Sequence, residues 1–108
     1  MKDVVRYAEM LDLYGGILTE KQFEMLDSYY CRDLTLEEIA ENNGISKQAV
    51  HFAIKNAQAK ISKLEKQLGI LARHDALEEM LSEAEEAIRN GEDDALVIRR
   101  LEDIAKKL

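Results

Sequence analysis

Apolar residues recur every three or four positions along most of the chain, and this spacing is the period of amphipathic α-helices. No stretch of useful length alternates apolar and polar residues as a strand would. The pattern therefore predicts an all-α protein. The predicted helices cover residues 3–14, 20–32, 36–43, 47–68, 77–88 and 94–108.

Capping signals place the ends of these helices. Thr19–Gln22 and Thr35–Glu38 each have the spacing of a capping box, in which the first side chain and the fourth satisfy each other's backbone N–H groups. Ser46 suits the N-cap of the long fourth helix. The pairs Gly15-Gly16 and Asn43-Gly44 are expected to end the first and third helices.

The last two helices are predicted to form an antiparallel hairpin. Asn90-Gly91 supplies a short turn between their apolar stripes, and Asp93 or Asp94 can cap the last helix. Because the fourth helix is longer than a DNA-reading helix needs, we expect the hairpin to cover its far end. Residues 1–71 then form one domain that includes the long helix, and residues 72–108 form a helical hairpin packed on it.

The stretch LTLEEIAENNGISKQAV, residues 34–50, has the spacing of a helix-turn-helix unit. In such a unit the second helix presents its N-terminal turns to a nucleic-acid groove. Lysines on that helix can contact phosphates, while amide and imidazole side chains can reach base edges. The candidate nucleic-acid contacts are Ser46, Lys47, Gln48, His51, Lys55, Asn56, Lys60 and Lys63.

The charge distribution agrees with this location. The chain has a net charge of -7, yet residues 46–74 contain six basic side chains and one acidic side chain. Local potential governs docking, and acidic surfaces farther away are screened over about 8 Å at physiological salt. The alternative interpretation is a lysine row that forms an ordinary solvated helix face.

Other classes of protein are disfavoured by the composition. The longest apolar runs are only a few residues, and the N-terminus lacks a signal-peptide layout, so we expect a cytoplasmic protein without membrane insertion. Cys31 has no cysteine partner, and the spacing of His51 and His74 does not suggest a metal site. No phosphate-cradling glycine loop or nucleophile elbow is present, so we predict neither catalytic residues nor a cofactor.

Residues 17–71 resemble the bacterial YlxM family, whose members are similar to the promoter-reading C-terminal domain of sigma factors. The resemblance rests on LTEKQ, on YY followed by RDLTLEEIAE, and on ISKQAV followed by IK. It implies a sigma-factor-like helix-turn-helix bundle in a protein of the signal recognition particle pathway. The implied nucleic-acid partner is either the RNA of the particle or DNA. The implied protein partners are the targeting GTPases. Lys47 stands where arginine is common in the family, and Asn56 where we expect a basic residue.

Three hypotheses about function follow. The first is a nucleic-acid-binding accessory or regulatory protein of the targeting pathway that uses the helix at residues 46–66. The second is a protein-interaction module, such as a homodimer, because apolar residues near the end of the long helix exceed what the small core needs. The third is a sigma-like DNA-binding transcription regulator. The residues of the predicted protein interface are Leu64, Leu68, Ile70 and Leu71.

Overall fold

The computed structural model describes residues 3–108, and these residues form six α-helices and no strand. The all-α prediction is confirmed. The helices are α1 (Val4–Tyr14), α2 (Glu20–Leu26), α3 (Leu36–Asn43), α4 (Lys47–Leu68), α5 (Ile70–Arg89) and α6 (Asp94–Lys106). A 3-10 turn, η1 (Gly15–Ile17), follows α1, and a π-helical turn, η2 (Asp27–Cys31), follows α2.

The chain divides into two compact units. The first ends at Gly69 and contains α1 to α4, and the second runs from Ile70 to Leu108 and contains α5 and α6. The first two residues of the predicted domain 1–71 lie outside the described residues. The packing of the hairpin on the long helix stays a prediction.

The predicted caps are present in the first unit. Thr19 Oγ1 accepts a hydrogen bond from the Gln22 backbone N–H at 3.2 Å, and Gln22 Oε1 accepts one from the Thr19 N–H at 3.1 Å. Thr35 and Glu38 repeat this reciprocal pattern at 3.1 Å in both directions. Because each box satisfies two N–H groups that lack an intrahelical partner, the starts of α2 and α3 are fixed locally.

The turn between α3 and α4 has a tight left-handed conformation at Gly44. Its φ is 65°, a region that a residue with a Cβ atom rarely occupies. The Ile45 N–H then bonds to the Ala40 carbonyl at 3.1 Å, which closes the end of α3. The predicted glycine at the turn of the helix-turn-helix unit is confirmed.

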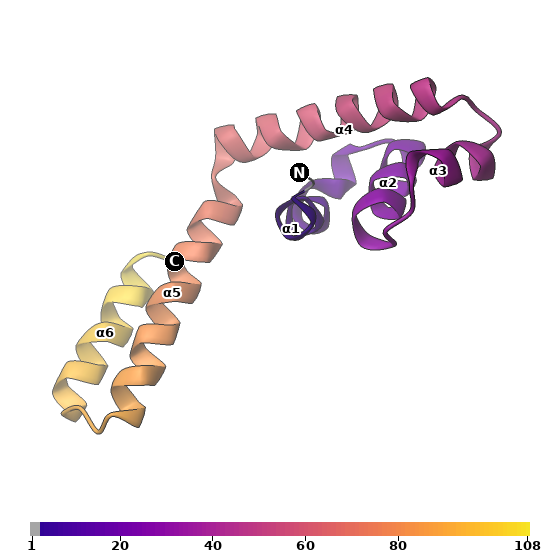
Figure 1. The fold of residues 1–108 in the computed structure, drawn as a ribbon. Coiled ribbons are helices and arrows are strands. Elements are labelled where there is room, and N and C mark those ends of the chain that lie inside the picture. Colours follow the sequence, from indigo (N-terminus) through magenta and orange to yellow (C-terminus); the bar gives the residue numbers. More distant parts are fainter. Residues whose placement is uncertain (1–2) are drawn as a thin grey trace. The chain divides into compact units, whose positions relative to one another are not determined.

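The first unit is built around one side of α4. Figure 1 shows α1, α2 and α3 lying along the same side of this helix, and α4 contacts each of them. Its buried apolar residues recur at intervals of three or four positions, so they form one stripe. They are Val50, Ile54, Ala57 and Ile61. The stripe packs against buried residues of the other three helices: Met10, Leu11, Tyr14, Met25, Leu26, Ile39 and Ala40.

A polar contact joins α1 to the far end of α4. The Tyr14 hydroxyl donates to Glu65 Oε1 at 2.5 Å, and both residues are buried. A buried carboxyl group needs such a donor because its desolvation is otherwise costly. The bond therefore fixes where α1 crosses the long helix.

The predicted helix at residues 20–32 changes its winding at Asp27. The segment Asp27–Cys31 is π-helical, and it places Tyr30 in the core. The Tyr30 ring stacks on Tyr7 with centroids 4.9 Å apart, and its hydroxyl is hydrogen-bonded to Gln58. Burial raises the pKa of Tyr30 to about 12. The wider π-helical turn thus positions Tyr30 for its contacts with α1 and α4. The periodicity of the sequence did not predict these contacts.

Phe23 of α2 is an apolar residue that the core does not fully cover. It is partly exposed, while Met25 is buried in its place. The Phe23 ring lies over Gly15, where an added Cβ would be only 2.6 Å from Phe23 Cε2. Gly15 itself has φ of -57°, an ordinary helical value. Its lack of a side chain is therefore required for close packing rather than for a left-handed cap.

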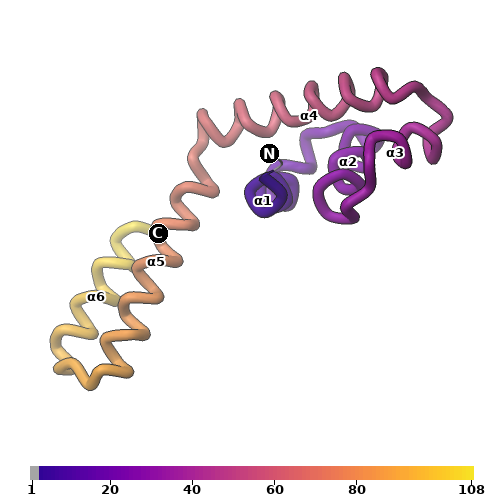
Figure 2. Tube along the Cα trace, viewed as in Figure 1, coloured from indigo at the N-terminus to yellow at the C-terminus, as the bar shows by residue number. Residues whose placement is uncertain are grey.

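The second unit is an antiparallel helical hairpin. α5 and α6 contact each other and run side by side in the tube representation of Figure 2. The Asn90-Gly91 turn is present as predicted, with the Glu92 N–H bonded to the Ala87 carbonyl at 3.0 Å. Asp93 occupies the N-cap position of α6, although its side chain makes no capping bond. α5 begins at Ile70, seven residues before the predicted helix start at residue 77. Gly69 is the only residue between α4 and α5.

We predict that Tyr14→Phe lowers the free energy of unfolding by about 1–2 kcal/mol, because Glu65 loses a buried donor. Urea denaturation followed by circular dichroism measures this change. Tyr7→Phe on the same helix is the control, since it keeps the ring that stacks on Tyr30. An equal loss in both variants would contradict a specific role for the Tyr14 hydroxyl.

Candidate nucleic-acid interface

The outward face of α4 lies opposite its buried stripe and carries most of the predicted contact residues. At about 100° per residue, positions 48, 55, 56 and 63 point away from the core. All eight predicted residues between Ser46 and Lys63 are exposed. The 22 residues of α4 span about 33 Å, so the face forms an extended strip rather than a compact patch.

Two of the predicted lysines are held at the edges of this strip by neighbouring helices. Lys47 Nζ lies 2.7 Å from Glu37 Oε1 of α3. Lys60 Nζ donates to Gln22 Oε1 of α2 at 3.3 Å. Their positive charges are therefore directed toward the sides of the helix, whereas Lys55 and Lys63 extend from its outward face.

Ser46 has a structural role at the start of α4. Its Oγ accepts a hydrogen bond from the Ala49 backbone N–H at 3.1 Å, which makes it the N-cap. This bond occupies one acceptor site of the hydroxyl group and anchors the first turn of the helix. The predicted helix start is confirmed at this residue.

Phe52 is a surface aromatic residue to which the sequence analysis assigned no contact. Its side chain is 68% exposed on the polar face of α4. It borders a shallow, mainly apolar hollow of about 350 Å³ beside the first turns of the helix. The available signal was a phenylalanine four positions after Gln48, on the face that should be polar. The hollow is lined by Leu36, Lys47, Gln48, His51 and Phe52.

The helix before the turn is acidic where phosphates would come close. Glu37, Glu38 and Glu41 are all exposed on α3. In helix-turn-helix proteins that read duplex DNA, the corresponding helix crosses the phosphate backbone. The hydrogen bond from Lys47 holds the pKa of Glu37 below its usual value, so this carboxylate stays ionised at neutral pH. α3 therefore opposes the usual approach to a duplex.

The lone thiol is not electrostatically activated. Cys31 is exposed, but nearby protein atoms remove part of its solvation and thereby raise the pKa of its thiol. The hydrogen bond with Asp27 raises it further. A raised pKa reduces the thiolate fraction, which is the nucleophilic form. The thiol therefore lacks the electropositive surroundings of a catalytic cysteine.

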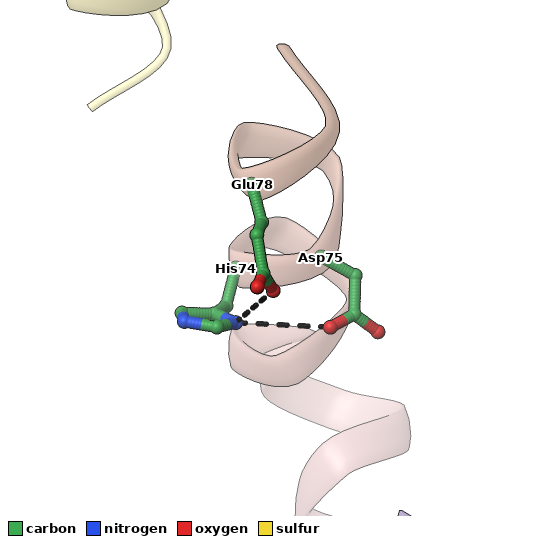
Figure 3. A group of neighbouring side chains, drawn as sticks. All are labelled: His74, Asp75 and Glu78. Carbon is green, nitrogen blue, oxygen red and sulfur yellow. Dashed lines mark ion pairs between the residues drawn. The ribbon is translucent and has the colours of Figure 1, made fainter. Parts of the chain in front are cut away.

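His74 lies near two carboxylates that the sequence analysis did not connect with it. Its Nδ1 atom is 3.7 Å from both Asp75 Oδ1 and Glu78 Oε2 (Figure 3). The candidate ligand atoms of the three residues lie within 4.8 Å of one another, and all three residues are exposed. The order His, Asp and then Glu four positions after the His was the available signal. Their contacts are those of ion pairs on one helical turn, and we assign no metal to them.

The predicted protein interface contains one residue that is not available at the surface. Leu68 and Ile70 are substantially exposed and Leu64 is half-buried, but Leu71 is only 2% exposed. The expectation that Leu71 is exposed was therefore wrong. Because Gly69 ends α4, Ile70 and Leu71 belong to another helix and do not continue the apolar stripe of Leu64 and Leu68.

Within residues 3–108, every helix is too short or too polar to cross a membrane.

Comparisons with known proteins assign the chain to a family. The family described as "UPF0122: Putative helix-turn-helix protein, YlxM / p13 like" matches residues 1–103. This chain belongs to the UPF0122 family. The predicted family resemblance is therefore confirmed, and the description of the family names a helix-turn-helix.

UPF0122 proteins of several bacteria are similar to this chain over most of its length. A UPF0122 protein of Symbiobacterium thermophilum is 43% identical over 88 residues, which cover 82% of each chain. Another, from Thermoanaerobacter sp. strain X514, is 34% identical over 102 residues, covering 92% of this chain and 87% of the relative. The similarity thus includes the hairpin as well as the helix-turn-helix unit.

We predict that Lys47→Gln raises the pKa of the Glu37 carboxyl group toward its ordinary value, because the main group favouring the ionised form is removed. Because the pKa of Glu37 is lowered in the folded chain, its ion pair stabilises the fold at pH values above the ordinary pKa of a glutamate. This stabilisation is lost as the pH falls through the lowered pKa of the folded state. NMR titration of the Glu37 side chain measures the change. Lys55→Gln is the control, and an unchanged Glu37 titration in Lys47→Gln would contradict the pairing.

Proposed function

We propose that this chain is an RNA-binding accessory protein of the bacterial signal recognition particle pathway. Its helix-turn-helix family suggests nucleic-acid binding. The observation that carries the proposal is the outward face of α4, where exposed lysines flank an exposed aromatic side chain. Lysines neutralise phosphates, and aromatic rings stack on bases, so the two together suit a nucleic acid.

The same face favours RNA with unpaired bases over duplex DNA. Bases within a duplex are stacked on each other, whereas those in RNA loops and bulges can stack on protein side chains. Phe52 offers such a platform next to Gln48 and His51, which can bond to base edges. Glu37 and the other carboxylates of α3 oppose the docking on a duplex that a sigma-like regulator requires.

The assignment to the particle rests on the family resemblance. Members of the YlxM family are associated with the targeting pathway, so the particle's RNA is the proposed ligand and the targeting GTPases are proposed partners. Because the outward lysines are few, the RNA contact is expected to be modest in affinity and sensitive to salt. A protein bound alongside the RNA would strengthen it through effective concentration. We propose that the present chain acts in the cytoplasm, where the particle and its RNA are found.

Lys66, in the last turn of α4, is a further exposed lysine. We expect a variant with Lys55, Lys63 and Lys66 changed to Gln to bind particle RNA at least tenfold more weakly in low salt. Three lost phosphate contacts should also reduce the slope of log affinity against log salt by about 2. Fluorescence anisotropy with labelled RNA over a salt series measures both quantities, and duplex DNA of equal length is the comparison ligand.

The matched control changes Arg73, Arg100 and Lys107 to Gln. It removes the same number of exposed positive charges from the hairpin. Equal weakening by the two triple variants would attribute binding to net charge and contradict an interface on α4. Tighter binding of duplex DNA than of RNA would instead favour the sigma-like regulator.

We expect Phe52→Ala to weaken binding of looped RNA by about 5- to 100-fold, because one base loses its stacking platform. Phe52→Tyr should retain most of the affinity. Phe23→Ala, at the other partly exposed phenylalanine, is the control. Anisotropy with a stem-loop and with the fully paired stem separates stacking from phosphate contacts. A loss of equal size for both RNAs would rule out stacking on an unpaired base.

A further inference from the structure

The α5–α6 hairpin exposes apolar side chains that it cannot bury itself. Among its 39 residues, those fully buried are Leu71, Ala84, Ala87 and Ile104. Helical units of this size usually gain stability from a disulfide, a metal or association with another chain. The only cysteine is Cys31, which lies outside the hairpin, so a disulfide within it is excluded.

The exposed apolar residues form a row on each helix. On α5 the row consists of the half-buried Leu77 and the exposed Leu81 and Ile88, and on α6 it consists of the exposed Ile98, Leu101 and Ala105. At 100° per residue, each row lies about 70° around its helix from the residues that face the other helix. The facing residues are Met80, Ala84 and Ala87 on α5, and Val97 and Ile104 on α6.

The two rows lie on the same side of the hairpin. Both are displaced from the facing residues in the same rotational sense along the chain. Each row is rotated by a similar angle about its own helix axis, viewed from the N- to the C-terminus. Because α5 and α6 are antiparallel, equal rotations in this sense bring both rows to the same face of the hairpin. The six residues thus make a continuous apolar surface, which we call the hairpin face. Leu96 is also 48% exposed, but it lies on the opposite side of α6.

We propose that the hairpin face binds the hairpin face of a second copy of this chain, which produces an antiparallel four-helix bundle. In a dimer with a twofold axis, the same surface patch of both copies forms the interface, so the hairpin face can bind the hairpin face of another copy. With the axis along the bundle, α5 packs against α6 of the second copy, and Leu81 lies opposite the second copy's Leu101. Such short-loop hairpins are the usual halves of four-helix bundles.

Charges at the borders of the hairpin face favour this arrangement. The α5 border carries Glu78 and Glu85, with Arg89 paired to Glu85 and His74 close to Glu78. The α6 border carries Arg99 and Lys106 together with Glu102. When α5 packs against α6 of the other copy, acidic and mainly basic borders meet. The other twofold arrangement would place α5 against α5 and bring like charges together, which costs free energy. Glu78 and Glu85 with Arg89 give the α5 border a net charge of -1, and Arg99 and Lys106 with Glu102 give the α6 border +1, so the charges favour the α5-to-α6 pairing.

The area of the hairpin face determines how strong the dimer should be. The larger side chains of the face, Leu81, Ile88, Ile98 and Leu101, are each 46–59% exposed, so each copy offers a patch of a few hundred Å² at most. Apolar patches of a few hundred Å² commonly mark interaction sites, yet stable complexes bury about 1,200–2,000 Å² in total. We therefore expect a weak, reversible dimer rather than a permanent one.

The hairpin face and the proposed RNA contacts belong to different units of the chain. The outward face of α4 consists of lysines, amides and small residues, with Phe52 as its large apolar side chain. This face also carries the proposed RNA contacts. Dimerisation through the hairpin is therefore a property beyond the proposed function, and the two can fail independently.

Sedimentation equilibrium of the full chain from about 10 µM to 1 mM tests the proposal. We expect a monomer–dimer equilibrium that Leu81→Gln and Leu101→Gln each weaken at least tenfold. The matched control is Leu96→Gln, because Leu96 and Leu101 are the same residue type on the same helix with exposures of 48% and 46%. A monomer throughout the range, or equal weakening by Leu96→Gln, would overturn the proposal.

Disulfide trapping provides a second measurement that does not rely on destabilising variants. In a Cys31→Ser background, an oxidised mixture of Leu81→Cys and Leu101→Cys chains should give a mixed disulfide-linked dimer, identified by mass spectrometry. A mixture of Leu81→Cys and Leu96→Cys chains should give little. Equal yields from the two mixtures would refute the α5-to-α6 pairing.

Discussion

The burial of one side of α4 against three shorter helices is the constraint on which the first unit depends. Val50, Ile54, Ala57 and Ile61 provide the surface on which α1, α2 and α3 pack. Since this stripe faces inward along most of the helix, the opposite side must face solvent. The Tyr14–Glu65 hydrogen bond extends the same attachment toward the C-terminal end. A long, straight and outwardly polar surface is the result.

This geometry accounts for the presence of a basic segment in an acidic chain. The acidic side chains of α3 compete for the nearest lysine, as the Glu37–Lys47 pair shows. Farther along α4, Lys55 and Lys63 project outward and are available to phosphates. The boundary between acidic and basic surface therefore lies within the helix-turn-helix unit itself. It favours a ligand that lies along α4 over a duplex that must also accommodate α3.

The second unit is limited by a different quantity, its small number of buried apolar residues. Two helices joined by a short turn can bury only the narrow strip where they face each other. Ala84 and Ala87 allow close approach on that strip, but the larger Leu81 and Leu101 remain half exposed beside it. A second copy would enlarge this core without changing α4. Association and nucleic-acid binding can thus reside in separate parts of one short chain.

The sequence alone determined the features that depend on neighbouring residues. The helices, both capping boxes, the Ser46 cap and the Gly44 turn each involve groups within a few positions, so their signals are present in short stretches. The outward location of Gln48, His51 and Lys55 also followed from the helical period. Their role in binding remains a prediction, because periodicity places a side chain without identifying its ligand.

Only the tertiary structure decided the features that depend on distant residues. The π-helical turn at Asp27–Cys31 arises with the contacts of Tyr30 to Tyr7 and Gln58. The partial exposure of Phe23 depends on its packing over Gly15, and the position of Lys60 depends on Gln22. Each of these contacts joins separate elements. Local periodicity reports which face of a helix is apolar, whereas packing between helices decides how much of that face is covered.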